Sequence, residues 1–205
     1  MNWEDLQSEI SKCEECISRW RGHIADPLSM GEIPDPPAKV KVLFVGVAPT
    51  NRIGRNRGEH FYSSTRDNLR RELFRLLHDH FDVPVKGLPL EMGNSVFHGE
   101  GYFFVHAAKV RPVGQDAPPS EALLYCANRH LKAEITILAP QAVCFLGITN
   151  LGPVAFSLLN RRVSETAIRV SFCGWTGWVG LAPQPVRGNR ERTGLVIAKL
   201  LSLIG

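Results

Sequence analysis

The chain has 205 residues, a net charge of +4, and 44% hydrophobic and 21% charged residues. This balance excludes a disordered or fibrous protein and predicts a single folded domain over residues 1–205. The longest apolar runs are too short to cross a bilayer, and the first residues have neither the basic nor the apolar region of a secretion signal. We therefore expect a monomeric, cytoplasmic protein without membrane contact.

Strands and helices alternate along the predicted chain. A helix over residues 3–20 is followed by a connector rich in proline and glycine. Continuous apolar runs predict buried strands of a parallel sheet, and periodic leucines predict helices between them. The predicted strands are 40–47, 101–110 and 140–148 with a strand pair in 167–183, and the later helices are 64–81, 121–138, 150–162 and 194–204. This order predicts an α/β fold, a three-layer αβα sandwich around a central, mainly parallel four-stranded sheet.

Arginines gather in loops that follow the predicted strands. Three of them lie in residues 50–61, and three more lie in residues 184–193. Ligands of parallel sheets bind beyond the carboxyl ends of the strands, where these loops begin. Clustered arginines suit the phosphates of a nucleic acid better than evenly spread charge does. The alternative is that both loops are ordinary solvated turns.

Two of the five cysteines have the spacing of a metal site. Cys13 and Cys16 form a C-x-x-C pair near the end of the first predicted helix. This spacing lets two thiolates bind one metal or cluster, although a single pair is a weak signal.

Four segments, taken together and in order, carry a family resemblance. They are "CEEC" at 13–16, "VGVAPTNRIGRNRGEHF" at 45–61, "HAAKVRPVGQDAPPSEALLYC" at 106–126 and "APQPVR" at 182–187. In this order and spacing the chain resembles the uracil-DNA glycosylase superfamily, in particular its iron–sulfur branch of type 4 and type 5 bacterial enzymes. The second segment is similar to the family motifs G-E-A-P-G and G-L-A-P, and the last takes the place of H-P-S-P-x-x-R.

The resemblance implies a role for each matching residue. Phe61 would stack on uracil, and His106 would face the base and is the first catalytic candidate, before Asn51 and Arg52. The resemblance implies a base pocket formed by Gly46, Val47, Ala48, Pro49, Phe61 and His106. It implies DNA contacts by Arg55, Arg57, Lys109, Arg111, Gln184 and Arg187.

The chain also departs from the family at chemically important positions. Val47 and Ser64 stand where the type 4 and type 5 enzymes, respectively, carry a carboxylate. His106 replaces the asparagine that reads the edge of uracil, and Ala182 replaces the catalytic histidine. For water activation the nearby polar candidates are Asn51, Glu59, His60 and Asp67.

The cluster positions of the family are only partly kept. Cys13, Cys16 and Cys126 remain, but Val110 replaces the third cysteine. The three cysteines either bind a cluster with another ligand or pack as apolar residues, so an iron–sulfur cluster is possible but no cofactor is firmly implied.

The resemblance predicts an enzyme that flips uracil out of single- or double-stranded DNA and hydrolyses its N-glycosidic bond. One alternative is a glycosylase for another deaminated base, which the loss of the edge-reading asparagine motivates. Another is a DNA-binding protein without catalysis, which the combined loss of catalytic groups motivates. A panel of lesion-containing oligonucleotides separates a uracil glycosylase from a glycosylase for another deaminated base. Salt-sensitive DNA binding without release of any base indicates the non-catalytic DNA-binding protein.

Overall fold

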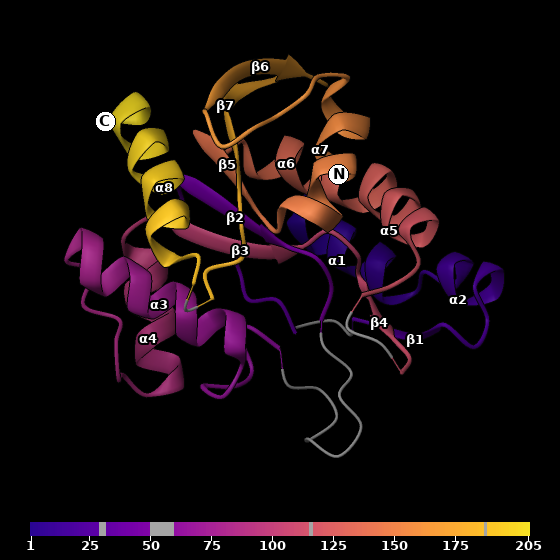
Figure 1. The fold of residues 1–205 in the computed structure, drawn as a ribbon. Helices are drawn as coiled ribbons and strands as arrows, with labels where there is room; N and C mark the ends of the chain where they lie inside the picture. The colour runs from indigo at the N-terminus through magenta and orange to yellow at the C-terminus, as the bar shows by residue number, and fades with distance from the viewer. Residues whose placement is uncertain (29–31, 50–59, 115–116, 187) are drawn as a thin grey trace.

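The computed structural model describes residues 1–28, 32–49, 60–114, 117–186 and 188–205. Its centre is a five-stranded sheet in the order β3-β2-β5-β7-β6 (Figure 1). Its strands are β2 (Val42–Gly46), β3 (Tyr102–His106), β5 (Ala142–Leu146), β6 (Ile168–Phe172) and β7 (Trp175–Ala182). β3, β2, β5 and β7 are parallel, as predicted, and β6 joins the edge as an antiparallel hairpin partner of β7. The predicted count of four strands is therefore corrected to five.

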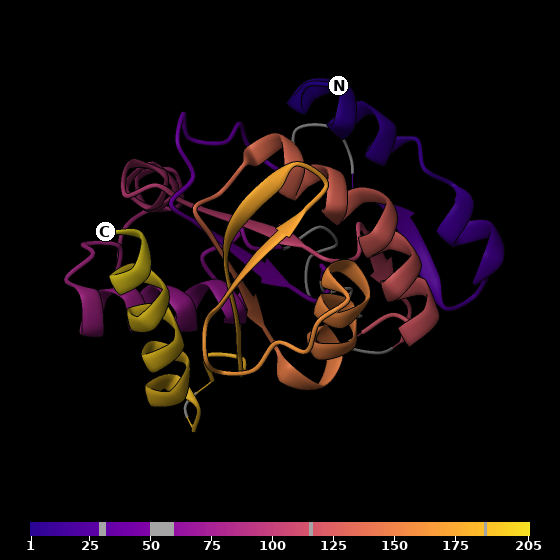
Figure 2. The ribbon, with the colours of Figure 1, turned by 90° about the horizontal axis from the view of Figure 1, so that it is seen from above.

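Helices cover both faces of this sheet, which makes the predicted three-layer sandwich (Figure 2). On one side, α8 packs on β5 and β7, α3 packs on α8, and α4 packs on β3. On the other side, α7 packs on β5 and β7 and contacts α5, while α1 packs on α6. The helices are α1 (Trp3–Ser11), α2 (Glu15–Arg19), α3 (Asn68–Phe81), α4 (Leu90–Gly99), α5 (Ser120–Cys126), the π-helical turn η1 (Ala127–Leu131), α6 (Lys132–Leu138), α7 (Ile148–Leu159) and α8 (Arg190–Ile204).

Apolar residues explain why the central strands form. Every residue of β2, β3 and β5 is buried, as expected for strands covered by helices on both faces. α3 begins where the side chain of Asp67 accepts a hydrogen bond from the backbone N–H of Arg70 at 2.7 Å, and it buries Leu73, Leu76 and Leu77. Across the described ranges, every helix is too short or too polar to traverse a lipid bilayer.

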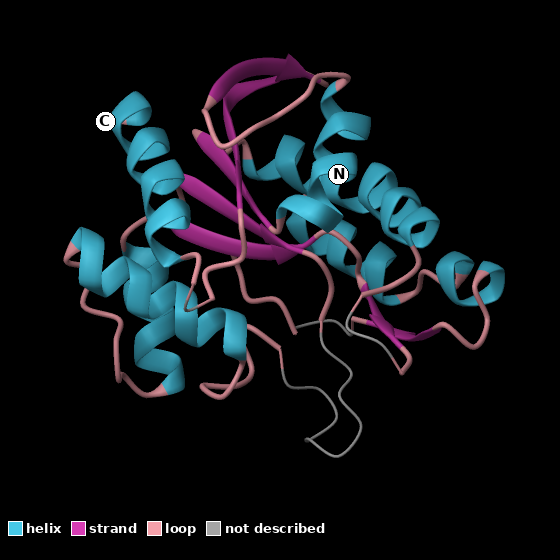
Figure 3. Cartoon of the chain, in the orientation of Figure 1, coloured by secondary structure: helices cyan, strands magenta, loops and turns pink. Residues whose placement is uncertain are grey.

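The N-terminal region differs from the prediction. Instead of one helix over 3–20, α1 ends at Ser11 and α2 begins at Glu15, so Cys13 lies between them. The predicted connector contains the short strand β1 (Ile24–Pro27), which pairs with β4 (Val110–Pro112) in a separate antiparallel sheet (Figure 3). Backbone pairing with β4, rather than a periodic sequence, makes β1 a strand.

Candidate active site

The carboxyl ends of the parallel strands gather at one edge of the sheet, and the loops that follow them meet there. Gly46 of β2 lies opposite His106 of β3. The pairing continues past the strands, because Ala107 N–H donates to Gly46 O at 2.8 Å and Ala108 N–H donates to Val47 O at 2.9 Å. The chain segments after β2 and β3 therefore leave the sheet together.

A second pair of loops meets the first. The N–H of Gly147, after β5, donates to Ala182 O at the end of β7. A Cβ atom on Gly147 would lie 3.6 Å from the Gln184 side chain and 3.7 Å from Val47, so three loops approach one another at this glycine. The predicted pocket residues Val47, Ala48 and Pro49 are all buried at this edge.

His106, the last residue of β3, is a buried polar side chain at this edge. It is 6% exposed, and neither ring nitrogen has a hydrogen-bond partner among the described residues. Burial lowers the pKa of His106 well below its usual range, and the positive charges of Lys109 and Arg111 lower it further. The imidazole is therefore neutral at pH 7, with one N–H donor and one acceptor nitrogen.

Phe61 lies in a cluster of aromatic rings beside His106. Its ring stacks on Phe104 with 4.0 Å between the centroids, and Phe104 meets the ring of His106 edge-on at 4.9 Å. Tyr62 and Phe74 contact Phe61 at their edges. Phe104 covers one face of the Phe61 ring, and Phe61 is only 1% exposed. A base could therefore stack on the other face only after the groups that cover it move away. The stacking role on uracil remains a prediction.

Gly46 makes room for this aromatic row. A Cβ atom at Gly46 would lie 2.6 Å from Cζ of Phe104, closer than side-chain atoms normally approach. The missing side chain of Gly46 thus lets the Phe104 ring pack against β2, and its role in the base pocket stays a prediction.

A set of hydrogen bonds from α3, α4 and β3 holds the segment that carries Phe61. Arg70 donates to the carbonyl oxygen of Phe61 at 3.0 Å and also to the side chain of Asn94. Asn94 in turn donates to Tyr62 O at 3.4 Å, and the Tyr62 hydroxyl accepts the N–H of Phe104 at 2.8 Å. Burial lowers the pKa of Arg70 to about 10, which still leaves it cationic at pH 7. The sequence analysis did not anticipate this buried role of Arg70.

A carboxylate that sequence reasoning did not select also reaches this edge. Glu32 Oε1 lies 3.7 Å from Nε2 of His60 and forms an ion pair with Nη2 of Arg111. Glu32 lies in the predicted connector, where no motif or periodic pattern marks it.

The predicted DNA-contacting residues have different environments. Lys109 is 1% exposed, its Nζ lies 2.5 Å from Oε2 of Glu134, and it also donates to the carbonyl oxygen of His106. This placement argues against a DNA contact by Lys109, because the phosphates cannot reach a buried ammonium. Arg111 pairs with Glu32, whereas Gln184 is exposed. The remaining predicted contacts and catalytic candidates lie outside the described residues, namely Asn51, Arg52, Arg55, Arg57 and Arg187.

The departures from the family are also visible here. Val47 and Ala182 are buried and apolar. The Ser64 hydroxyl oxygen accepts the N–H of Arg66 at 3.1 Å. None of these three side chains can accept a proton from water as a carboxylate or an imidazole does.

The cysteines do not form a complete cluster site. A hydrogen bond from Cys126 lowers the pKa of Cys16, and the same bond, followed by burial, raises the pKa of Cys126 well above its usual range. The position of the third family cysteine is taken by Val110, which is buried in β4. Within the described ranges, no three His, Cys, Asp or Glu side chains are grouped so that they could hold a metal ion. The residues present therefore do not fit a four-cysteine iron–sulfur cluster.

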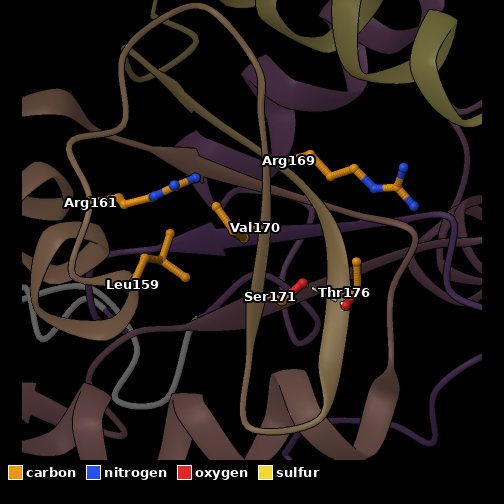
Figure 4. A pocket seen from close by; sticks show the side chains of 6 residues that line it. All are labelled: Leu159, Arg161, Arg169, Val170, Ser171 and Thr176. Atoms are coloured by element: carbon orange, nitrogen blue, oxygen red, sulfur yellow. Dashed lines mark hydrogen bonds between the residues drawn. The ribbon is translucent and has the colours of Figure 1, made fainter.

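A surface cavity of about 610 Å³ lies away from this edge (Figure 4). It borders the amino-terminal half of β7 and the end of α7, and it is lined by Leu159, Arg161, Arg169, Val170, Ser171 and Thr176. Because the predicted base pocket lies at the carboxyl end of β7, this cavity is not the base pocket.

A comparison with known protein families finds a match over most of the chain. Residues 33–192 match the family described as the Uracil DNA glycosylase superfamily, a range that covers all the central strands and the edge residues named above except Glu32. No curated protein matches the chain. Membership of this family indicates a function of the DNA glycosylase type, with DNA as the substrate. The chain belongs to the uracil DNA glycosylase superfamily.

Proposed function

We propose that the protein is a monofunctional uracil-DNA glycosylase with an atypical active site, which hydrolyses the N-glycosidic bond and leaves an abasic site. The observation that carries this proposal is the neutral, unpartnered imidazole of His106 at the carboxyl edge of the sheet. A buried polar group without a partner is costly, and a site for a polar ligand accounts for it. The flipped base would stack on Phe61, at the end of the aromatic row that leads to His106, once the second face of this ring is uncovered.

His106 is suited to the charge that forms on the leaving base. Cleavage of the glycosidic bond gives an oxocarbenium-like sugar and a uracil anion, and donors near the anion lower the barrier. A neutral imidazole can donate its N–H to a uracil oxygen while the other nitrogen accepts. Loss of such a donor costs about 3–4 kcal/mol in comparable oxyanion sites, so His106 would offset part of what Ala182 no longer provides.

The same residue motivates a second candidate function. A side-chain amide can accept from N3–H of uracil and donate to O4 at once, whereas one imidazole cannot make both bonds in a single plane. His106 in the asparagine position therefore also favours a glycosylase for another deaminated base, such as hypoxanthine or xanthine.

The test is base release from an oligonucleotide with a single uracil, single- or double-stranded, read by alkaline strand cleavage. We expect cleavage by the native protein and a large loss in Phe61→Ala. Matched oligonucleotides with hypoxanthine or xanthine test the second function. Salt-sensitive DNA binding without release of any of these bases would instead indicate a non-catalytic DNA-binding protein. We further propose that the protein acts as a monomer in the cytoplasm, which size-exclusion chromatography and cell fractionation test.

A further inference from the structure

The carboxylate of Glu32 lies beside His60 and Arg111, in a chain where Val47 and Ser64 occupy the family's carboxylate positions. Hydrolysis needs a group that takes a proton from the attacking water. Val47 is apolar, and the Ser64 hydroxyl is too weak a base to serve. Among carboxylates in the described ranges, Glu134 is completely buried against Lys109 and Glu72 lies with Arg190 between α3 and α8. Asp67 caps α3, where it accepts the backbone N–H of Arg70.

The surroundings of Glu32 orient its carboxylate. Its Oε1 faces Nε2 of His60 at 3.7 Å and Nη2 of Arg111. The other nitrogen of His60, Nδ1, accepts the N–H of Tyr62 at 3.3 Å, so the proton of neutral His60 is on Nε2 and points toward Glu32. Burial lowers the pKa of His60, which keeps the ring neutral at pH 7, although the charge of Glu32 opposes this shift.

Glu32 also borders the candidate site. Glu32 lies 3.7 Å from His60, and Phe61, whose ring is linked to His106 through Phe104, directly follows His60 in the chain. The Glu32 side chain is 21% exposed, whereas that of His60 is 3% exposed. Glu32 therefore combines a negative charge and access to solvent with two neighbours that fix its orientation.

We propose that Glu32 is the catalytic carboxylate that accepts a proton from the attacking water, with His60 and Arg111 as positioning residues. This inference rests on the proposed glycosylase function. As the C1′–N1 bond breaks, its electron pair leaves with the base. The water oxygen bonds to C1′, and the water proton moves to Glu32. The base anion takes a proton from solvent, and Glu32 returns its proton to solvent.

The experiment measures single-turnover base release from a uracil-containing duplex at about pH 7.5. Glu32→Gln keeps the size of the side chain and an oxygen that can accept from Arg111, but it removes the basic carboxylate. We expect release to fall about 10²- to 10⁴-fold with DNA affinity unchanged. Glu100→Gln, an exposed carboxylate at the end of α4, is the control and should retain the native rate.

A second variant covers the case in which Glu32→Gln does not fold. Glu32→Asp keeps the charge but withdraws the carboxylate by one methylene, so it should release base at a reduced rate that still exceeds the rate of Glu32→Gln. Native rates in Glu32→Gln, or in Glu32→Asp where Glu32→Gln does not fold, would overturn the role of Glu32 and leave the glycosylase function standing. If the native protein releases no base, both proposals fail together.

Discussion

The ring of Phe61 lies parallel to the ring of Phe104, with 4.0 Å between the centroids and 10° between the planes. This stack joins the end of the loop after β2 to the edge strand β3. Because Phe104 also meets His106 edge-on, the positions of Phe61 and His106 are linked through one ring. We infer that a shift of the Phe61 ring would also shift the imidazole of His106.

Phe104→Leu tests this link. The substitution removes the shared ring, so we expect a loss of about 1–3 kcal/mol in the free energy of unfolding and a larger proportional loss of base release. Phe172→Leu in β6, which contacts Trp175 far from the site, is the control. Urea denaturation and single-turnover release compare the two. If Phe104→Leu and Phe172→Leu lose the same activity at the same stability, the row of rings from Phe61 to His106 has no specific role in catalysis.

Gly46→Ala tests the space that Phe104 occupies. The added Cβ would lie 2.6 Å from Cζ of Phe104, and overpacking of this kind costs about 1–3 kcal/mol. Gly99→Ala at the end of α4 is a matched control, because a Cβ there has no atom within 4 Å and alanine favours the helix by up to about 1 kcal/mol. Thermal and urea unfolding measure both. A Gly46→Ala protein as stable as the native one would mean that the Phe104 ring shifts at no cost.

The ion pair between Lys109 and Glu134 is a stability test that separates structure from DNA binding. Removal of one partner leaves a buried charge, so Lys109→Met alone should cost about 3–5 kcal/mol. The double variant Lys109→Met, Glu134→Leu should recover most of this loss. Urea denaturation of the four proteins of this cycle gives the coupling energy. If Lys109→Met instead leaves stability intact and weakens DNA binding, the sequence-based role of Lys109 was right.

His130 should make stability depend on pH. Burial, followed by the charges of Lys109 and Arg129, lowers the pKa of His130 to about 4, against about 6.5 in an unfolded chain. Below pH 6.5 the unfolded state binds more protons than the folded state, so stability falls as the pH drops from about 7 to about 4. The loss amounts to about 3 kcal/mol at most. His130→Leu should show a smaller fall between pH 7 and pH 4.5 in urea denaturation, and an unchanged fall would contradict this assignment.

The sequence predicted those parts of the fold that have strong local patterns. The apolar runs of β2, β3 and β5 and the leucine period of α3 each indicate their element without tertiary information. α4 was not predicted, because Gly93, Asn94 and Gly99 weaken its helical propensity and packing of Phe97 stabilises it instead. β1 has only four residues, and its pairing partner lies far away in the sequence.

The candidate site was predictable only where motifs extend along the chain. Val47, Phe61 and His106 were found from ordered segments that resemble the family. The contact between Glu32 and Arg111 joins residues 79 apart in sequence, and the bond from Arg70 to Asn94 joins two helices. No periodicity or spacing reports such contacts, because packing of separate elements creates them.

The measurement that tests the central claim most directly is uracil release by the native protein and by His106→Leu, under single-turnover conditions with saturating enzyme. Both proteins should bind the uracil-containing duplex with similar affinity. We predict alkali-labile abasic sites with the native protein and release at least about 100-fold slower with His106→Leu, as expected for loss of a group that stabilises the leaving base. Equal rates in the two proteins, or DNA binding without any base release by the native protein, would contradict the account.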